Sequence, residues 1–130
     1  MSQVGKRALV YLVDDDVSVR KAIGRLLHTN GFDVREFASP EEFLNCTADG
    51  SPACVLLDIT MPGLSGLQVQ AHLKARGIRW PVIAVSARED ESARDASRQL
   101  GARFFLRKPV DAHALLDAIE WVSGNGNEAA

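Results

Sequence analysis

The 130-residue sequence lacks the features that mark several classes of protein. It has two cysteines, Cys46 and Cys54, and no CxxC pair, which excludes a zinc site built from thiols alone and fits a reducing compartment. No apolar run approaches the roughly 20 residues that a membrane-spanning helix needs. The short apolar run near the N-terminus ends in three aspartates, unlike a signal peptide. We therefore expect a cytoplasmic protein without a membrane partner.

An excess of charge of one sign is also missing. The formal net charge is −2, so no basic surplus points to nucleic acid or to anionic lipid. What is present is a hydrophobic fraction of 46%, enough for one core in a chain of this length. We assign residues 1–123 to one domain and the small, polar residues 124–130 to a flexible C-terminal tail.

Two kinds of segment alternate along the chain. Short aliphatic or aromatic runs predict buried strands at residues 8–13, 54–57, 82–85 and 104–106, with a weaker edge strand at 33–37. Helical spacing and capping signals predict helices over residues 17–30, 66–76, 89–100 and 111–122, and a further helix that opens with the capping box at 39–42. This order predicts an α/β fold, a doubly wound five-stranded parallel sheet with helices on both faces.

Polar residues stand where the predicted strands end. They are Asp14, Asp15 and Asp16 after the first strand, Asp58 after the third, Ser86 after the fourth and Lys108 after the fifth. The carboxyl ends of parallel strands meet at one edge of the sheet, so we expect these groups to converge. Clustered carboxylates repel one another, and a hard cation such as Mg²⁺ relieves that repulsion. With a lysine and a hydroxyl beside them, the set predicts a phosphoryl-transfer site with a carboxylate as acceptor.

These residues lie in stretches that resemble the receiver domain of bacterial two-component response regulators. The similarity covers about residues 7–122, and its main stretches are VYLVDDDVSVRKAIGRLL, CVLLDITMPGLSGL, PVIAVSA and FFLRKPV. The stretches NGFDVREFASPEEFL and DITMPGLSGL look closest to the FixJ-type subfamily. The resemblance implies a flavodoxin-like or CheY-like (βα)5 fold.

The resemblance also implies roles for single residues. Asp58 matches the phosphoacceptor of the family, and Lys108 matches the lysine that pairs with the phosphoryl oxygens. Asp15 matches a direct ligand of Mg²⁺ (or Mn²⁺), and Asp14 matches its water-bridged neighbour. The carbonyl group of Thr60, together with Asp58, would complete the metal ligands of the protein.

Further positions match the parts of the family that respond to phosphorylation. Ser86 occupies the switch position that carries a hydroxyl, and Phe105 occupies the aromatic position that changes rotamer with it. Thr60 and Arg88 stand two residues after the phosphoacceptor and after the switch hydroxyl, where the family tunes the lifetime of the phosphate. Lys108–Pro109 matches a cis peptide bond of the family.

The implied function is phosphorelay signalling. A sensor histidine kinase or a histidine phosphotransfer protein would phosphorylate Asp58, and the domain would catalyse its own phosphorylation and dephosphorylation without a turnover substrate. No recognition helix follows the last predicted helix, so we expect no direct binding of nucleic acid. The chain is either a single-domain regulator with a protein target or a receiver excised from a larger transcriptional regulator. The segment 88–98 is very polar for a signalling face, which argues against dimerisation through this segment. A phosphorylation-dependent homodimer is still one alternative for the response.

Two other readings use the same residues differently. Asp58-Ile59-Thr60 faintly resembles the nucleophile motif of haloacid-dehalogenase-type phosphatases, but Thr60 cannot replace the second aspartate that transfers a proton there. A degenerate receiver that serves only as an interaction module is the third reading. Such modules lose the acidic pair, the phosphoacceptor or the lysine, all of which this sequence keeps.

Overall fold

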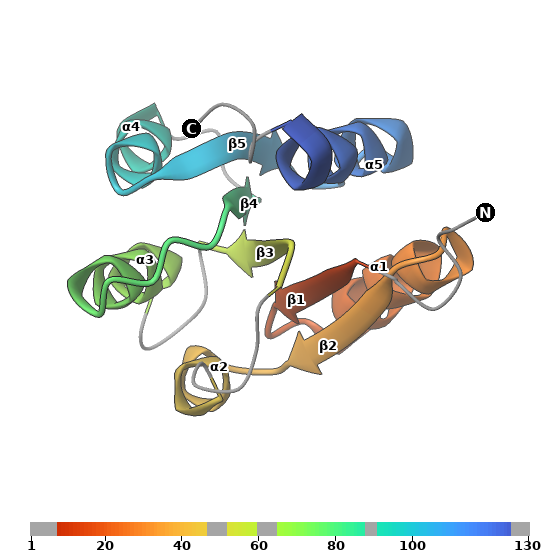
Figure 1. Cartoon of the computed structure of the whole chain (residues 1–130), viewed down its shortest axis with the longest axis horizontal. Coiled ribbons are helices and arrows are strands. Elements are labelled where there is room, and N and C mark those ends of the chain that lie inside the picture. Colours follow the sequence, from red (N-terminus) through yellow and green to blue (C-terminus); the bar gives the residue numbers. More distant parts are fainter. Residues whose placement is uncertain (1–7, 47–51, 60–64, 88–90, 126–130) are drawn as a thin grey trace.

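The computed structural model describes residues 8–46, 52–59, 65–87 and 91–125. In chain order the elements are β1 (Leu9–Val13), α1 (Val17–Thr29), β2 (Asp33–Phe37), α2 (Pro40–Asn45), β3 (Cys54–Asp58), α3 (Gly66–Ala75), β4 (Val82–Ser86), α4 (Glu91–Gln99), β5 (Ala102–Arg107), α5 (Ala112–Glu120) and a π-helical turn, η2 (Trp121–Asn125). The strands form one parallel sheet in the order β2-β1-β3-β4-β5. Figure 1 shows α1 and α5 on one face of this sheet and α2, α3 and α4 on the other. The predicted doubly wound fold is confirmed.

The strands extend beyond the apolar runs that predicted them. β3 and β4 each include one polar residue more, Asp58 and Ser86, and β5 runs from Ala102 to Arg107. Pairing between neighbours is the reason, because Asp58 lies in register with Val85 and Ser86 with Arg107. A sheet continues as long as its backbone groups find partners, whatever the polarity of the side chains.

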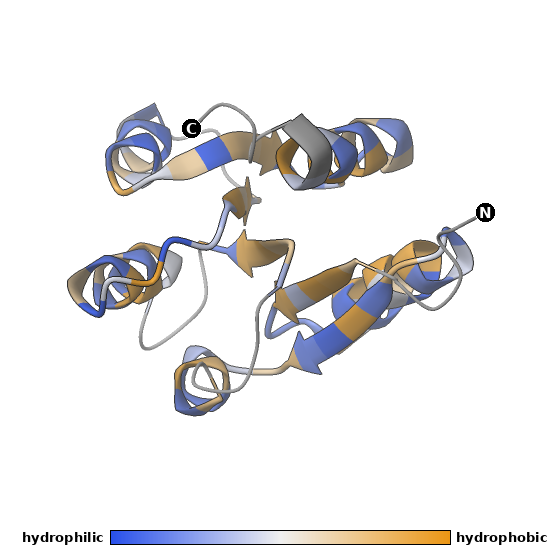
Figure 2. Ribbon diagram, in the orientation of Figure 1, coloured by the Kyte–Doolittle hydropathy of each residue, from blue (hydrophilic) through white to orange (hydrophobic). Residues whose placement is uncertain are grey.

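Each face of the sheet has its own hydrophobic core. Side chains of successive strand residues point to opposite faces, so Tyr11 and Leu57 pack under α2 and α3, whereas Leu12 and Leu56 pack under α1 and α5. The central strands are therefore buried on both faces. Figure 2 shows these strands in orange, while the edge strand β2 alternates between blue and orange.

Side-chain caps fix where the helices begin. Asp16 and Asp111 accept hydrogen bonds from the backbone of the first turns of α1 and α5. Ser39 caps α2 as predicted, but the carboxylate of Glu42 accepts from the N–H of Ala38 rather than from that of Ser39. The complete capping box, which the sequence reading missed, belongs to Ser65 at the start of α3.

The last helical segment extends beyond its predicted end. We expected the helix to end at residue 122, but η2 continues α5 through Asn125. Trp121 packs its ring edge to face on Phe104 at 5.6 Å between ring centroids, which holds α5 against β5. Within the described residues, no helix has the length and apolar character needed to cross a membrane.

Candidate functional site

The first part of the site forms where β1 and β3 end. Val13 lies in register with Leu57, so Asp14 and Asp58, the next residues of the two adjacent strands, lie side by side at the carboxyl edge of the sheet. Asp14, Asp15 and Asp58 each offer a carboxylate oxygen, and these atoms lie within 4.8 Å of one another. Asp14 and Asp58 are buried, and Asp15 is exposed. The predicted convergence of carboxylates is thus present at this edge.

Lys108 brings a positive charge into the same cluster from the end of β5. Its Nζ atom lies 3.0 Å from Oδ2 of Asp14 and 3.0 Å from Oδ2 of Asp58. The backbone N–H of Lys108 donates to the carbonyl of Ser86 at 2.9 Å, which ties this residue to the end of β4. The Lys108–Pro109 peptide bond is cis, as expected. One ammonium group therefore bridges two buried carboxylates.

Burial and the contacts within the cluster shift the pKa values of Asp14 and Lys108. Burial raises the pKa of Asp14, although hydrogen bonds from the backbone of Asp16 and from Lys108 work against the rise. Burial also works to lower the pKa of Lys108, but its hydrogen bonds to Asp14 and Asp58 outweigh burial and raise that pKa above its ordinary value. The lysine thus stays charged, and it neutralises part of the charge on both carboxylates.

A second set of contacts holds Asp14 in place, and the sequence reading missed it. The N–H of Asp16 donates to Oδ1 of Asp14 at 2.9 Å, and the guanidinium of Arg20 donates to the carbonyl of Asp14 at 2.7 Å. Nε of Arg20 also lies 3.4 Å from Oε1 of Glu36 on β2. The sequence feature that could have revealed this contact is the position of Arg20, four residues after the cap Asp16. At this spacing the side chain of Arg20 can turn back toward the end of β1.

Of the three consecutive aspartates Asp14, Asp15 and Asp16, the first two belong to the cluster and the third does not. Oδ1 of Asp16 accepts the N–H of Val19 at 3.1 Å, so Asp16 serves as the cap of α1. The remaining donors, three carboxylates with one of them open to solvent, suit a hard divalent cation that keeps several waters. The residues present therefore fit an ion of the Mg²⁺ type.

The two predicted switch residues lie on β4 and β5. Ser86 is buried at the end of β4, one residue beyond Val85, which pairs with Asp58. Phe105 is half-buried and packs against the core under α2, α3 and α4, while its neighbour Phe104 packs on the opposite face. Strand alternation places the side chain of Ser86 on the same face as that of Phe105, because Phe105 pairs with Ala84. Thr60 and Arg88, the other two predicted site residues, lie outside the described residues.

Other polar candidates take no part in the cluster. His28, His72 and His113 are exposed on three different helices. Cys54 is buried at the start of β3, where burial raises the pKa of its thiol to about 12. These residues therefore supply neither a ligand nor a nucleophile at the carboxyl edge.

A five-stranded doubly wound sheet with an acidic cluster and a lysine that bridges two of its carboxylates at the carboxyl edge defines the CheY-like class of flavodoxin-like domains. Comparison with known sequences agrees with this class. The sequence model of the response regulator receiver domain matches residues 10–120, and the chain belongs to this family. Receiver domains are signalling domains of two-component systems, and a histidine kinase is the kind of partner that the family implies.

Similarity to individual proteins points to the FixJ type. The chain is 38% identical over 118 residues to the transcriptional regulatory protein TdiR of Thauera aromatica, covering 91% of the chain and 52% of TdiR. It is 34% identical over 119 residues to FixJ of Azorhizobium caulinodans, covering 92% of the chain and 56% of FixJ. The crystal structure of FixJ-N superposes with a TM-score of 0.86 at 30% identity, covering 92% of the chain and 96% of that structure. The chain spans about half the length of these two curated relatives.

Proposed function

We propose that this domain accepts a phosphoryl group on Asp58 from a sensor histidine kinase or a histidine phosphotransfer protein and signals through the surface that changes in response. The observation that carries the proposal is the position of Lys108, whose Nζ atom lies 3.0 Å from carboxylate oxygens of both Asp14 and Asp58. An ammonium group at this point can pair with an oxyanion that arrives at Asp58.

Asp14, Asp15 and Asp58, with the carbonyl of Thr60, would hold Mg²⁺ (or Mn²⁺). The carboxylate oxygens within 4.8 Å of one another and the exposure of Asp15 support this assignment, because a cation can enter with part of its hydration shell. When bound, the ion offsets negative charge on the transferring oxygens. Asp15 would contact the ion directly, and Asp14 would contact it through a water molecule.

The transfer itself uses one oxygen of Asp58 as the nucleophile. That oxygen forms a bond to phosphorus while the bond from phosphorus to the imidazole nitrogen of the donor breaks, and the histidine of the donor leaves with its electron pair. Lys108 exchanges its contact with the Asp58 carboxylate for one with a phosphoryl oxygen. Release of the group to water returns Asp58 to its starting state, so the domain has no turnover substrate and is not an enzyme in the ordinary sense.

The response would pass through Ser86 and Phe105. A phosphoryl group adds nearly two negative charges and three acceptor oxygens next to the end of β4. The hydroxyl of Ser86 would turn to donate to one of these oxygens, and the half-buried ring of Phe105 on the same face would fill the space that it leaves. Thr60 and Arg88 would set the lifetime of the phosphate, and replacing either should change the rate of dephosphorylation.

We propose that residues 1–123 form the receiver and that it acts in the cytoplasm, either as a single-domain regulator on a protein target or as the receiver of a larger transcriptional regulator. This part of the chain would bind no nucleic acid and no membrane itself. A phosphorylation-dependent homodimer is one form that the changed surface could favour.

Intact mass spectrometry after incubation with acetyl phosphate tests the acceptor. We expect one added phosphoryl group that requires Mg²⁺ and is absent in Asp58→Asn. Asp117→Asn, which removes an exposed aspartate of α5, is the matched control and should accept the group like the wild type. Equal uptake by Asp58→Asn would place the acceptor elsewhere, and no uptake by folded wild-type protein would contradict the phosphoacceptor role.

A further inference from the structure

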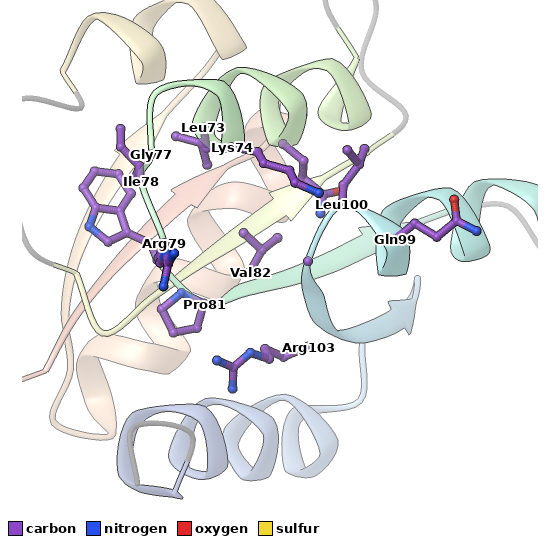
Figure 3. Close-up of a pocket in the computed structure, with 13 residues that line it drawn as sticks. Leu73, Lys74, Gly77, Ile78, Arg79, Pro81, Val82, Gln99, Leu100 and Arg103 are labelled. Carbon is purple, nitrogen blue, oxygen red and sulfur yellow. The ribbon is translucent and has the colours of Figure 1, made fainter. Parts of the chain in front are cut away.

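A pocket opens at the end of the sheet opposite the acidic cluster. It lies where α3 leads into β4 and where α4 leads into β5, as Figure 3 shows. Its volume is about 550 Å³, within the usual range of small-molecule sites. The pocket shares no residue with the acidic cluster, so neither the phosphoacceptor nor the metal ligands explain it.

Apolar side chains form much of the pocket wall. They are Leu73, Ile78, Trp80, Pro81, Val82 and Leu100. Trp80 is held in position from behind, because its ring packs edge to face on Tyr11 at 5.4 Å and at a tilt on Phe43 at 6.3 Å between centroids. Val82 is buried in β4. A wall anchored in this way is formed before any ligand arrives, which lowers the ordering cost of binding.

The charged side chains of the pocket all carry the same sign. Lys74, Arg79 and Arg103 line it, and no lining residue is acidic. In Figure 3, Arg79 and Arg103 lie near Pro81, while the side chain of Lys74 extends toward Leu100. Lys74, Arg79 and Arg103 are all exposed, and among the described residues none of the three has an ion-pair partner. Their positive charges are therefore available to a ligand at the mouth of the pocket.

The negative C-terminal ends of α3 and α4 do not neutralise the three positive charges of the pocket. A helix C-terminus carries about half a negative charge, so two of them offset about one of the three positive charges and leave a net charge of about +2. The last turns are moreover closed by backbone hydrogen bonds, from Gly77 to the carbonyl of Lys74 and from Gly101 to that of Arg98, each 3.0 Å long. The pocket therefore attracts anions.

We propose that this pocket binds a small organic anion with a carboxylate-like or phosphate-like head and a flat apolar body. The guanidinium groups of Arg79 and Arg103 present planar donor forks to the head, and Lys74 adds a third positive charge. The body packs on Trp80 and the aliphatic wall. Gln70 lines the same pocket and forms two buried hydrogen bonds with Ser97, so a bound ligand contacts the link between α3 and α4.

NMR titration with benzoate tests the site on the whole chain. We expect saturable shifts at the amides of Ile78, Leu100 and Gly101 and at the indole N–H of Trp80, with none at Asp14 or Asp58. Benzamide has the same ring without the charge, and we expect it to bind at least about tenfold more weakly. Inorganic phosphate tests the head alone and should also bind more weakly than benzoate.

Charge-removing variants locate the head group. Arg79→Gln and Arg103→Gln should each weaken benzoate binding about fivefold. Arg25→Gln removes an exposed arginine from α1 and should bind benzoate like the wild type. Equal binding of benzamide and benzoate, equal binding of phosphate and benzoate, unchanged binding in both pocket variants, or shifts that do not saturate would each overturn the proposal. Phosphate uptake by Asp58 should be normal in Arg79→Gln, so the two proposals fail independently.

Discussion

The ammonium group of Lys108 donates a hydrogen bond to Oδ2 of Asp58 over 3.0 Å. It lies equally close to Oδ2 of Asp14. A cation bound by these carboxylates would lie close to this ammonium group, and the two positive charges would repel each other. The lysine therefore stabilises the cluster before a cation binds and competes with that cation afterwards.

This competition predicts the effect of removing the ammonium group. We expect Lys108→Gln to bind Mg²⁺ at least tenfold more tightly than the wild type. A unit charge about 4 Å from a carboxylate is worth a few kcal/mol at an effective dielectric constant of about 20, and about 1.4 kcal/mol already corresponds to a factor of ten. Phosphate uptake should fall in the same variant, because the partner of the phosphoryl oxygens is lost. Isothermal titration calorimetry with Mg²⁺ measures the first effect. Lys74→Gln, at the opposite end of the sheet, is the control, and unchanged or weaker Mg²⁺ binding in Lys108→Gln would contradict the competition.

The sequence alone was enough to predict which residues come together at the site, but not the contacts that each of them makes. Parallel strands share a carboxyl edge, so the positions of Asp14, Asp58 and Lys108 after apolar runs predict their convergence once the alternation of strands and helices is recognised. Their individual contacts depend on side-chain directions, which no residue pattern specifies. Arg20 is the example, because a basic residue in the first turns of a helix is usually solvated, yet here it donates to the carbonyl of Asp14.

Polar residues inside the fold are the other part that the sequence could not reveal. The segment that forms α4 is mostly polar and charged, and its sequence gives no sign of a buried polar residue. Ser97 in α4 is nevertheless buried against Gln70 of α3, and both residues are hydrogen-bonded to each other. Burial of a polar pair costs little when both members find partners, and a pattern of single residues does not show which partners meet.

This pair leads to a stability prediction. Ser97→Ala removes the donor that Oε1 of Gln70 accepts at 2.8 Å, so the free energy of unfolding should fall by about 1–3 kcal/mol. In a Gln70→Leu background the same change should cost less, because the acceptor is already gone. Urea unfolding of the wild type, both single variants and the double variant gives the coupling. Ser18→Ala, on the exposed first turn of α1, is the control, and additive effects of the two changes would rule out the coupling.

Two helical glycines should respond differently to alanine. A Cβ atom on Gly66 would lie 2.4 Å from Cα of Ile59 and 2.6 Å from the carbonyl oxygen of Asp58, whereas one on Gly24 would lie 2.6 Å from Oε2 of Glu36. Backbone cannot move aside, but the end of a glutamate can. Gly66→Ala should therefore cost about 3 kcal/mol of unfolding free energy and slow phosphate uptake by displacing Asp58.

Gly24→Ala serves as the matched variant for that experiment. Its gain in helix propensity, about 1 kcal/mol, offsets the rearrangement of Glu36, so we expect a net change within about 1 kcal/mol. Chemical unfolding and acetyl phosphate labelling of both variants measure the two effects. Equal destabilisation by the two substitutions would show that the backbone beside Asp58 can yield.

The buried thiol of Cys54 should make the free energy of unfolding depend on pH. Burial raises the pKa of its thiol to about 12, against 9.0 in the unfolded chain. Because the folded value is the higher one, the contribution of this thiol is complete below pH 9 and is lost as the pH rises toward 12. Each pKa unit corresponds to about 1.4 kcal/mol, so the wild type should lose about 2–3 kcal/mol more unfolding free energy than Cys54→Ala between about pH 8 and 11. Cys46→Ala, which changes the half-buried cysteine, should follow the wild type, whereas parallel curves for wild type and Cys54→Ala would refute the assignment.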